Sequence, residues 1–470
     1  MGGYRGSILR EASGQKRRVW IPLLVGLNLR KVNLEIGLND EDEETMSQRI
    51  IPDGMLTNIG PVDIGRKLLR RLRSGEGVGG RKHPRRVYEY GYDWRLSPHI
   101  LSRQLIEYLE NLPCNQGSDR GQPRQPGRGA LVIAHSLGGL IVRHAINQRP
   151  ELFSGVLFVG TPQHCVNILG PLRNGDTVLL SSRVLTAQVN FTLRSSYVLL
   201  PEDGHCFVDK KTGEKINMDF FDVNTWIKYA LSPCVVTVKS ASSLPSMSGG
   251  IEEAVKDAAR EGTSAATRDR TLAPQMDSTS STLNPFSHIP SFSEETVCTL
   301  PTSETIPYLD RTLKAIKQFK EELRFKPEIG YPPETGKQSE APDIMHCDEI
   351  TSIGSSATVT PTSPLATVPS ASIEEHKSVY YPPMAIIYAN NTPTVKGARV
   401  DGIESISLHN VYDDLIFGAG DGVCLAKAAQ LPPGYKACAK VLSDRGHISL
   451  LGDLDNVGKA IEGIVRERGW

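Results

Sequence analysis

A short apolar run followed by a tight turn and a helical run, LVIAHSLGGLIVRHAI at residues 131–146, constrains the fold more than any other segment. Residues 131–135 have the length and apolar character of a buried strand, and residues 137–148 have the pattern of a helix. Only Ser136 separates the two, so the chain must reverse direction in a very tight turn. A strand that runs directly into a helix is the building unit of a parallel sheet.

Other segments repeat this alternation of strand and helix. An amphipathic helix is expected at 97–112, and an amphipathic run within 443–461, after the last strand, is expected to form the closing helix. The further expected strands lie at 85–95, 154–162, 383–390 and 434–442. This order predicts an α/β fold, with a mostly parallel sheet and helices on both of its faces.

Composition predicts that this α/β core is interrupted by two insertions. Residues 235–304 and 326–379 are rich in Ser, Thr, Pro, Gly and charge, with few aromatic side chains. Such segments bury too little apolar surface to offset chain entropy, so we expect both to be disordered. The remaining chain comprises a first core part at 1–234 that includes a cap at about 163–232, a packing helix at 305–325 and a C-terminal core part at 380–470.

Charge and cysteine content exclude several classes of function. The 53 basic residues balance 53 acidic residues, so we expect no nucleic-acid partner. The eight cysteines lack C-x-x-C spacing, so we expect neither a zinc site nor a disulfide framework, and no metal or cofactor. No apolar run approaches the length of a membrane span, and no secretory leader is recognisable, so we expect a cytoplasmic protein.

The turn at Ser136 has the spacing of a nucleophile elbow. Ala134, Ser136 and Gly138 form the small-x-Ser-x-Gly pattern of α/β-hydrolases, in which bulky side chains two residues from the serine would collide with backbone. This places the Ser136 hydroxyl at a helix N-terminus, where N–H groups can stabilise an oxyanion. The alternative is a serine that only caps the helix.

An acid and a base follow the serine in the expected chain order. Asp421 lies between glycines after an expected strand, and His447 follows the last expected strand. A serine hydroxyl needs an imidazole to accept its proton and a carboxylate to orient that imidazole, so we predict Ser136, Asp421 and His447 as the catalytic residues. Asp413 and Asp414 are rival acids. His135, beside the serine, is expected to pack or cap rather than act as a base, because adjacent side chains at a strand end point apart.

Four motifs resemble the lecithin:cholesterol acyltransferase family, especially its intracellular fungal members: YGYDWRLSP at 90–98, AHSLGG at 134–139, GDGV at 420–423 and RGHISLLGD at 445–453. The resemblance implies the α/β-hydrolase fold and the same three catalytic residues. It also implies cleavage of a glycerolipid acyl ester through an acyl-enzyme, with transfer of the acyl group to water or an alcohol.

The segment GGYRGS at 2–7 resembles the family's glycine-rich oxyanion loop. By that likeness, the backbone N–H groups of Tyr4 and Leu137 are the oxyanion donors. The family enters this loop from a hydrophobic strand, whereas this sequence begins at the loop, so we expect either a truncated gene model or a sheet that lacks one strand. The extracellular members' lid disulfide has no counterpart before Cys114, which fits a reducing compartment.

Residues 62–73 predict a basic amphipathic helix that either lies on an anionic membrane surface or packs on the sheet with a solvated face. Three functions therefore remain open. The first is a serine-dependent lipid acyl hydrolase or O-acyltransferase with a lipid substrate. The second is another serine esterase, such as a carboxylesterase or thioesterase. The third is a catalytically inactive scaffold with disordered interaction segments.

Overall fold

The computed structural model describes residues 1–21, 24–25, 28–29, 33–75, 86–116, 129–164, 169–178, 181–236, 298–332, 380–408 and 410–469. Most of the two segments expected to be disordered, 235–304 and 326–379, lies outside the described residues.

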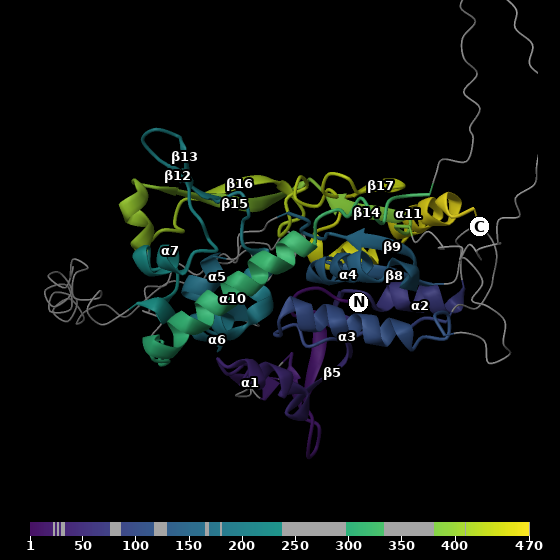
Figure 1. The fold of residues 1–470 in the computed structure, drawn as a ribbon, viewed down its shortest axis with the longest axis horizontal. Helices are drawn as coiled ribbons and strands as arrows, with labels where there is room; N and C mark the ends of the chain where they lie inside the picture. The colour runs from purple at the N-terminus through teal and green to yellow at the C-terminus, as the bar shows by residue number, and fades with distance from the viewer. Residues whose placement is uncertain are drawn as a thin grey trace, which may run out of the picture.

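A four-stranded parallel sheet forms the centre of the molecule (Figure 1). Its strand order is β17 (Ala439–Ser443), β14 (Met384–Ala389), β9 (Phe153–Val159) and β8 (Ala130–His135). Every pair of neighbours in this sheet is parallel. The expected α/β fold class is therefore confirmed, and β8, β9, β14 and β17 are the strands that the sequence predicted.

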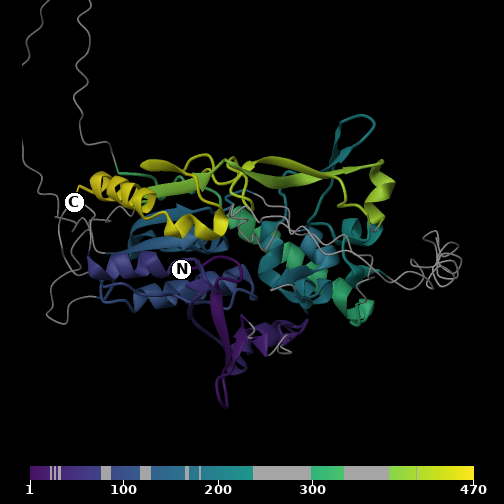
Figure 2. The same cartoon turned by 180° about the vertical axis from the view of Figure 1, so that it is seen from behind.

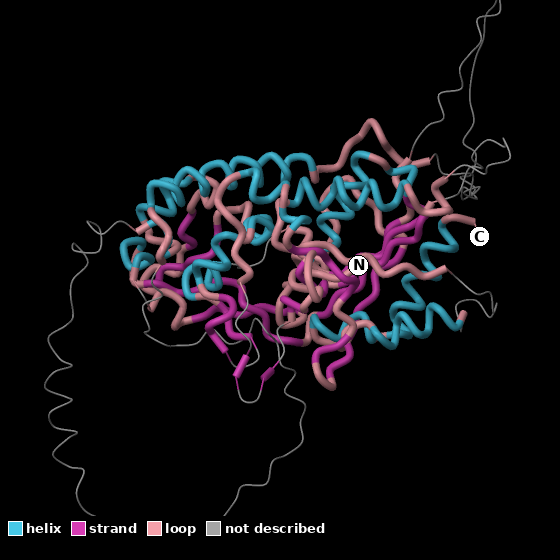
Figure 3. The backbone as a smooth tube through the Cα atoms, turned by 90° about the horizontal axis from the view of Figure 1, so that it is seen from below, coloured by secondary structure: helices cyan, strands magenta, loops and turns pink. Residues whose placement is uncertain are grey.

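The two faces of the central sheet pack against different helices, as Figure 3 shows. In β9, Val156 and Phe158 belong to one hydrophobic cluster and Leu157 and Val159 to another, as the alternation of side chains along a strand requires. All four side chains are buried, and each contributes about 1.5–3 kcal/mol of hydrophobic stabilisation. The first cluster contains side chains of α3 (Pro98–Glu110), α4 (Leu137–Gln148) and α10 (Thr302–Glu322), and the second contains side chains of α11 (Leu454–Glu467) and α2 (Arg66–Ser74).

A second four-stranded sheet lies at the opposite end of the molecule from α11 (Figures 1 and 2). Its order is β13 (Lys215–Asn217), β12 (His205–Asp209), β15 (Thr392–Val400) and β16 (Leu415–Gly420). Strand β12, from the segment expected to form a cap, pairs in parallel with β15 from the C-terminal part. The helices nearby are α5 (Leu169–Asn174), α6 (Ala187–Thr192) and α7 (Val223–Lys228).

A third, antiparallel sheet is built near the N-terminus from β2 (Arg18–Trp20), β1 (Ser7–Glu11) and β5 (Ile50–Met55). Figure 1 shows β5 projecting away from the central sheet. The remaining helix and strands are α1 (Asp40–Glu44), β3 (Leu24–Val25), β4 (Asn28–Leu29), β6 (Asn58–Ile59), β7 (Val62–Asp63), β10 (Asp176–Val178) and β11 (Ser181–Leu185). Short 3-10 turns, such as His447–Gly452, connect several elements.

The strand predicted at 85–95 is wrong. Described residues of this segment form no ladder with a neighbouring strand, although its aromatic side chains favour strands. Tyr92 and Trp94 are instead buried against the N-terminal loop, where the Trp94 indole N–H donates to the Ser7 carbonyl oxygen at 3.3 Å. Burial of these rings therefore determines the path of the segment.

Within the described parts of the chain, no helix combines the length and apolar character needed to cross a bilayer.

Candidate active site

Ser136 occupies a strained turn between β8 and α4. Its φ of +53° and ψ of −129° lie in a region that residues other than glycine rarely adopt, at a cost of about 1–3 kcal/mol. The Ser136 N–H donates to the carbonyl oxygen of Val159 in β9 at 2.9 Å, which fixes the turn to the neighbouring strand. A Cβ on Gly138 would lie 2.5 Å from the Gly2 carbonyl oxygen, so only glycine fits there. This geometry is the tight strand-to-helix turn that the small-x-Ser-x-Gly spacing predicts.

Asp421 and His447 form a buried hydrogen-bonded pair. The His447 ring nitrogen Nδ1 lies 2.8 Å from Asp421 Oδ2, and the His447 and Asp421 side chains are 4% and 2% exposed. The other carboxylate oxygen, Oδ1, accepts from the backbone N–H groups of Val423 at 2.9 Å and Cys424 at 2.6 Å. Burial by itself raises the pKa of Asp421, but the charge of His447 and these hydrogen bonds outweigh it and hold the pKa below its usual value of 3.8. The carboxylate therefore stays ionised and orients the imidazole.

Strand ends bring this pair close to Ser136. Asp421 follows β16 and His447 follows β17, and the His447 N–H donates to the Asp421 carbonyl oxygen at 2.8 Å. Gly160, the residue after β9, lies against both side chains, because a Cβ at this position would be 3.1 Å from Asp421 Oδ2 and from His447 Nδ1. Val159, which accepts the Ser136 N–H, immediately precedes Gly160. The three predicted residues are thus gathered at the carboxyl end of β9.

Among the described residues, the His447 ring is hydrogen-bonded to Asp421 and not to the Ser136 hydroxyl. In enzymes without substrate this contact is commonly long, and it tightens when substrate is bound.

His135 supports the site as a neutral packing residue. Its ring lies 4.7 Å from the His447 ring, and its Nε2 lies 2.9 Å from the His447 carbonyl oxygen. Burial, followed by the charge of His447, lowers the pKa of His135 to about 3. The ring is therefore neutral at neutral pH and donates its Nε2 proton to that carbonyl. Of the rival acids, Asp414 instead accepts from Arg399 at the surface, at 3.1 Å.

The N-terminal glycine loop lies directly against the elbow. A Cβ on Gly3 would be 2.4 Å from Ser136 Cβ and 3.1 Å from its hydroxyl oxygen, so the peptide that joins Gly3 to Tyr4 borders the serine. Leu137 is the first residue of α4, and its N–H therefore has no carbonyl partner within the helix. Of the two predicted oxyanion donors, the N–H group of Leu137 therefore directly follows Ser136 at the start of α4, and that of Tyr4 belongs to the loop residue that follows Gly3.

Side chains from distant segments hold this loop in place. The Tyr92 hydroxyl lies 3.0 Å from the carbonyl oxygens of both Gly2 and Gly3. The Tyr4 hydroxyl is 2.6 Å from Ser196 Oγ. The next residue, Arg5, donates to Asp176 at 2.6 Å and Asn190 at 2.8 Å.

Sequence reasoning missed the supporting roles of Tyr92, Gly160 and Thr394. The Thr394 hydroxyl oxygen accepts from the Gly422 N–H at 2.8 Å and so supports the turn that follows Asp421. The Tyr-Asp-Trp-Arg motif was the available signal for Tyr92. Nothing in the local pattern pointed to Thr394, because it lies on a different strand from the acid that it supports.

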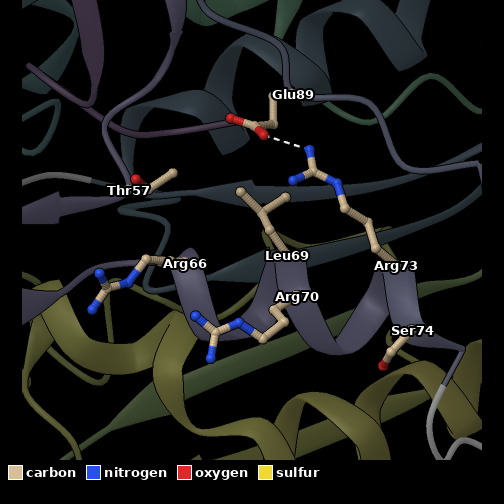
Figure 4. Close-up of a pocket in the computed structure, with 7 residues that line it drawn as sticks. All are labelled: Thr57, Arg66, Leu69, Arg70, Arg73, Ser74 and Glu89. Atoms are coloured by element: carbon tan, nitrogen blue, oxygen red, sulfur yellow. Dashed lines mark hydrogen bonds and ion pairs between the residues drawn. The ribbon is translucent and has the colours of Figure 1, made fainter.

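Two hollows on the described surface lie away from Ser136. The larger, of about 590 Å³, is lined by Thr57, Arg66, Leu69, Arg70, Arg73, Ser74 and Glu89. Figure 4 shows the arginines of α2 around it and the ion pair between Arg73 and Glu89. The basic amphipathic helix expected at 62–73 is present as α2 from Arg66 onwards, with its apolar Leu68 packed in the core and arginines at the surface, whereas Val62–Asp63 form strand β7.

In sequence, this chain is similar to an uncharacterized protein. It is 36% identical over 469 residues to the uncharacterized protein YJR098C of Saccharomyces cerevisiae, a match that covers 99% of this chain and 61% of that protein. The chain thus spans about three-fifths of the length of this relative. No family model matches. Among solved structures, a chain from the crystal structure of the Tle4-Tli4 complex is similar with a TM-score of 0.48 and 12% identity, over 100% of this chain and 97% of that one.

Proposed function

We propose that this chain is a serine-dependent hydrolase or O-acyltransferase that cleaves an acyl ester of a glycerolipid. Ser136 attacks the ester carbonyl, His447 accepts the serine proton, and Asp421 orients and stabilises the imidazolium. The backbone N–H groups of Tyr4 and Leu137 bind the oxyanion. The observation that carries the proposal is the buried Asp421–His447 pair at 2.8 Å, gathered with the strained Ser136 turn at the end of β9.

The proposed reaction has two halves. In the first, the imidazolium of His447 protonates the departing alcohol, and an acyl-Ser136 ester is left. In the second, His447 removes a proton from water or from an acceptor alcohol, which attacks that ester and restores the free serine. Access of water to the acyl-enzyme determines the balance between hydrolysis and transfer.

Two features support a lipid substrate. The first is the resemblance of the Tyr-Asp-Trp-Arg, serine, acid and histidine motifs to the acyltransferase family. The second is α2, whose residues Arg66 and Arg70 form no ion pair among the described residues and so are available to an anionic lipid surface. Leu68 of α2 packs with Leu450 and Leu451, which follow His447. A surface that binds α2 would therefore lie close to the proposed site.

Active-site labelling tests the proposal. A fluorophosphonate probe should label the wild type and should fail to label Ser136→Ala. Ser154→Ala is the matched control, because Ser154 is a buried serine outside the elbow, and this variant should be labelled like the wild type. Release of fatty acid from glycerophospholipid vesicles, compared with cleavage of short soluble esters, then separates a lipid enzyme from another serine esterase. A folded wild type that neither reacts with the probe nor cleaves either ester would instead support an inactive scaffold.

A further inference from the structure

Three side chains from three helices converge outside the proposed active site. His99 lies in the first turn of α3, His144 in the last part of α4, and Glu322 is the last residue of α10. The three helices contact one another (Figure 1). The candidate ligand atoms of these residues all lie within 4.8 Å of one another.

We propose that His99, His144 and Glu322 bind a divalent transition-metal ion of the zinc class, which joins α3, α4 and α10. Two imidazole nitrogens and one carboxylate oxygen are a donor set that Zn²⁺ accepts, with water in the fourth position. The proposal is independent of the acyl-transfer chemistry, because His144 lies eight residues beyond Ser136, about 12 Å along the helix.

The distances suit such an ion after a small movement. The Nε2 atoms of His99 and His144 lie 2.9 Å and 2.7 Å from the same carboxylate oxygen, Glu322 Oε2. Ligand atoms about 2.0 Å from a tetrahedral zinc ion lie about 3.3 Å apart, so the carboxylate needs to withdraw by about half an ångström. The two imidazole nitrogens, which lie within 4.8 Å of each other, need to come to the same separation. Since His99 and Glu322 are about one-third exposed, with side-chain exposures of 34% and 35%, water can reach the fourth position.

Neighbouring side chains already supply the outer contacts that metal ligands require. Gln318 donates to the second carboxylate oxygen of Glu322 at 2.8 Å. The side-chain amide of Gln148 lies 2.7 Å from Nδ1 of His144, and a half-turn of this amide presents its oxygen to an Nδ1–H when Nε2 binds metal. The Phe319 ring packs against the imidazoles of His99 and His144, at centroid distances of 5.1 Å and 4.3 Å, and limits their rotation.

The experiment is zinc binding to the full chain after removal of metal and reduction of its thiols. Calorimetric titration with Zn²⁺ should give one strong site per chain, and saturating zinc should raise Tm by about 5 °C. His99→Gln and Glu322→Gln should each weaken binding at least tenfold and remove most of the Tm rise. Both positions are partly exposed, so these variants avoid the buried His144. His205→Gln is the matched control, because His205 is 35% exposed and lies 3.6 Å from the Asp203 carboxylate, but belongs to no three-residue ligand cluster in the described part of the chain.

Cobalt substitution gives a second readout. Co²⁺ in the wild type should produce visible absorption typical of four-coordinate nitrogen and oxygen ligation, and this absorption should be lost in His99→Gln but kept in His205→Gln. The proposal is overturned if the wild type binds no zinc, or if His99→Gln and Glu322→Gln bind it as tightly as His205→Gln does. In either case, the three side chains form only a hydrogen-bonded cluster.

Discussion

Replacement of Asp421 by asparagine isolates the role of the buried carboxylate. Asparagine has nearly the same shape, and its side-chain oxygen can still accept the N–H groups of Val423 and Cys424, so the turn after β16 should keep its conformation. Its amide nitrogen would then face His447 Nδ1, where the carboxylate oxygen now lies at 2.8 Å. Since an amide N–H cannot accept, Nδ1 must become the acceptor, and the imidazole proton moves to Nε2. That tautomer cannot take the proton of Ser136.

The expected loss is large. The same exchange in serine proteases with a Ser-His-Asp triad lowers turnover by about 10⁴-fold, equivalent to about 5.5 kcal/mol of transition-state stabilisation. The free energy of unfolding should fall by less, about 1.5–3 kcal/mol, because one charge-assisted hydrogen bond is lost. The rate of fluorophosphonate labelling measures the first quantity, and chemical denaturation measures the second. Asp413→Asn, which changes an exposed rival acid, is the control and should react like the wild type.

The pH dependence of stability checks the same pair. The pKa of Asp421 is lower in the folded chain than in the unfolded chain, so its ionisation stabilises the fold above about pH 4. That contribution is lost as the pH falls through the folded-state pKa, and Asp421→Asn lacks it at every pH. The stability difference between the wild type and the variant should therefore shrink below about pH 4.

A folded Asp421→Asn protein that is labelled at nearly the wild-type rate would refute the assignment of Asp421 as the orienting acid.

Two further substitutions test the glycine loop. Gly3→Ala places a methyl group 2.4 Å from Ser136 Cβ, so either the glycine loop or the Ser136 turn must shift. We expect fluorophosphonate labelling to slow by about 100-fold, which is the effect of losing one oxyanion donor. An unchanged labelling rate would show that the loop does not define the site. Tyr92→Phe removes the hydroxyl that lies between the Gly2 and Gly3 carbonyl oxygens. We expect the free energy of unfolding, measured by denaturant titration, to fall by about 1–2 kcal/mol, and labelling to slow. A loss of stability without slower labelling would limit Tyr92 to a structural role.

Local sequence patterns predicted the parts of the fold in which neighbouring residues determine the conformation. The β8–Ser136–α4 unit follows from apolar periodicity and the elbow spacing, and the position of His447 follows from its place after the last strand. The strand predicted around Tyr92 is wrong because β-propensity reflects how well aromatic side chains fit any half-buried surface, whether or not a strand is present. The conformation of this segment is determined by contacts with Gly2 and Gly3, about 90 residues away in the chain.

Pairings between distant segments could not be predicted in the same way. Strand β12 joins β15 across more than 180 residues, and single-sequence periodicity says nothing about which strands become neighbours. The cluster of His99, His144 and Glu322 has the same origin. Metal ligands can be predicted from a sequence when they share a local motif, such as C-x-x-C spacing. These three side chains come one each from three helices and share no local motif.

The glycine loop connects the proposed chemistry to the segment that was expected to form a cap. Tyr4 and Arg5 follow the peptide that borders Ser136, and their side chains are held by Ser196 and by Asp176. Both members of the Arg5–Asp176 pair are less than one-tenth exposed, so loss of the pair would leave a buried charge without its counter-charge. A movement of this segment must therefore either carry the loop with it or break these contacts. Because a backbone N–H can bind an oxyanion only at hydrogen-bond distance, the proposed role of the Tyr4 N–H depends on the position of this segment.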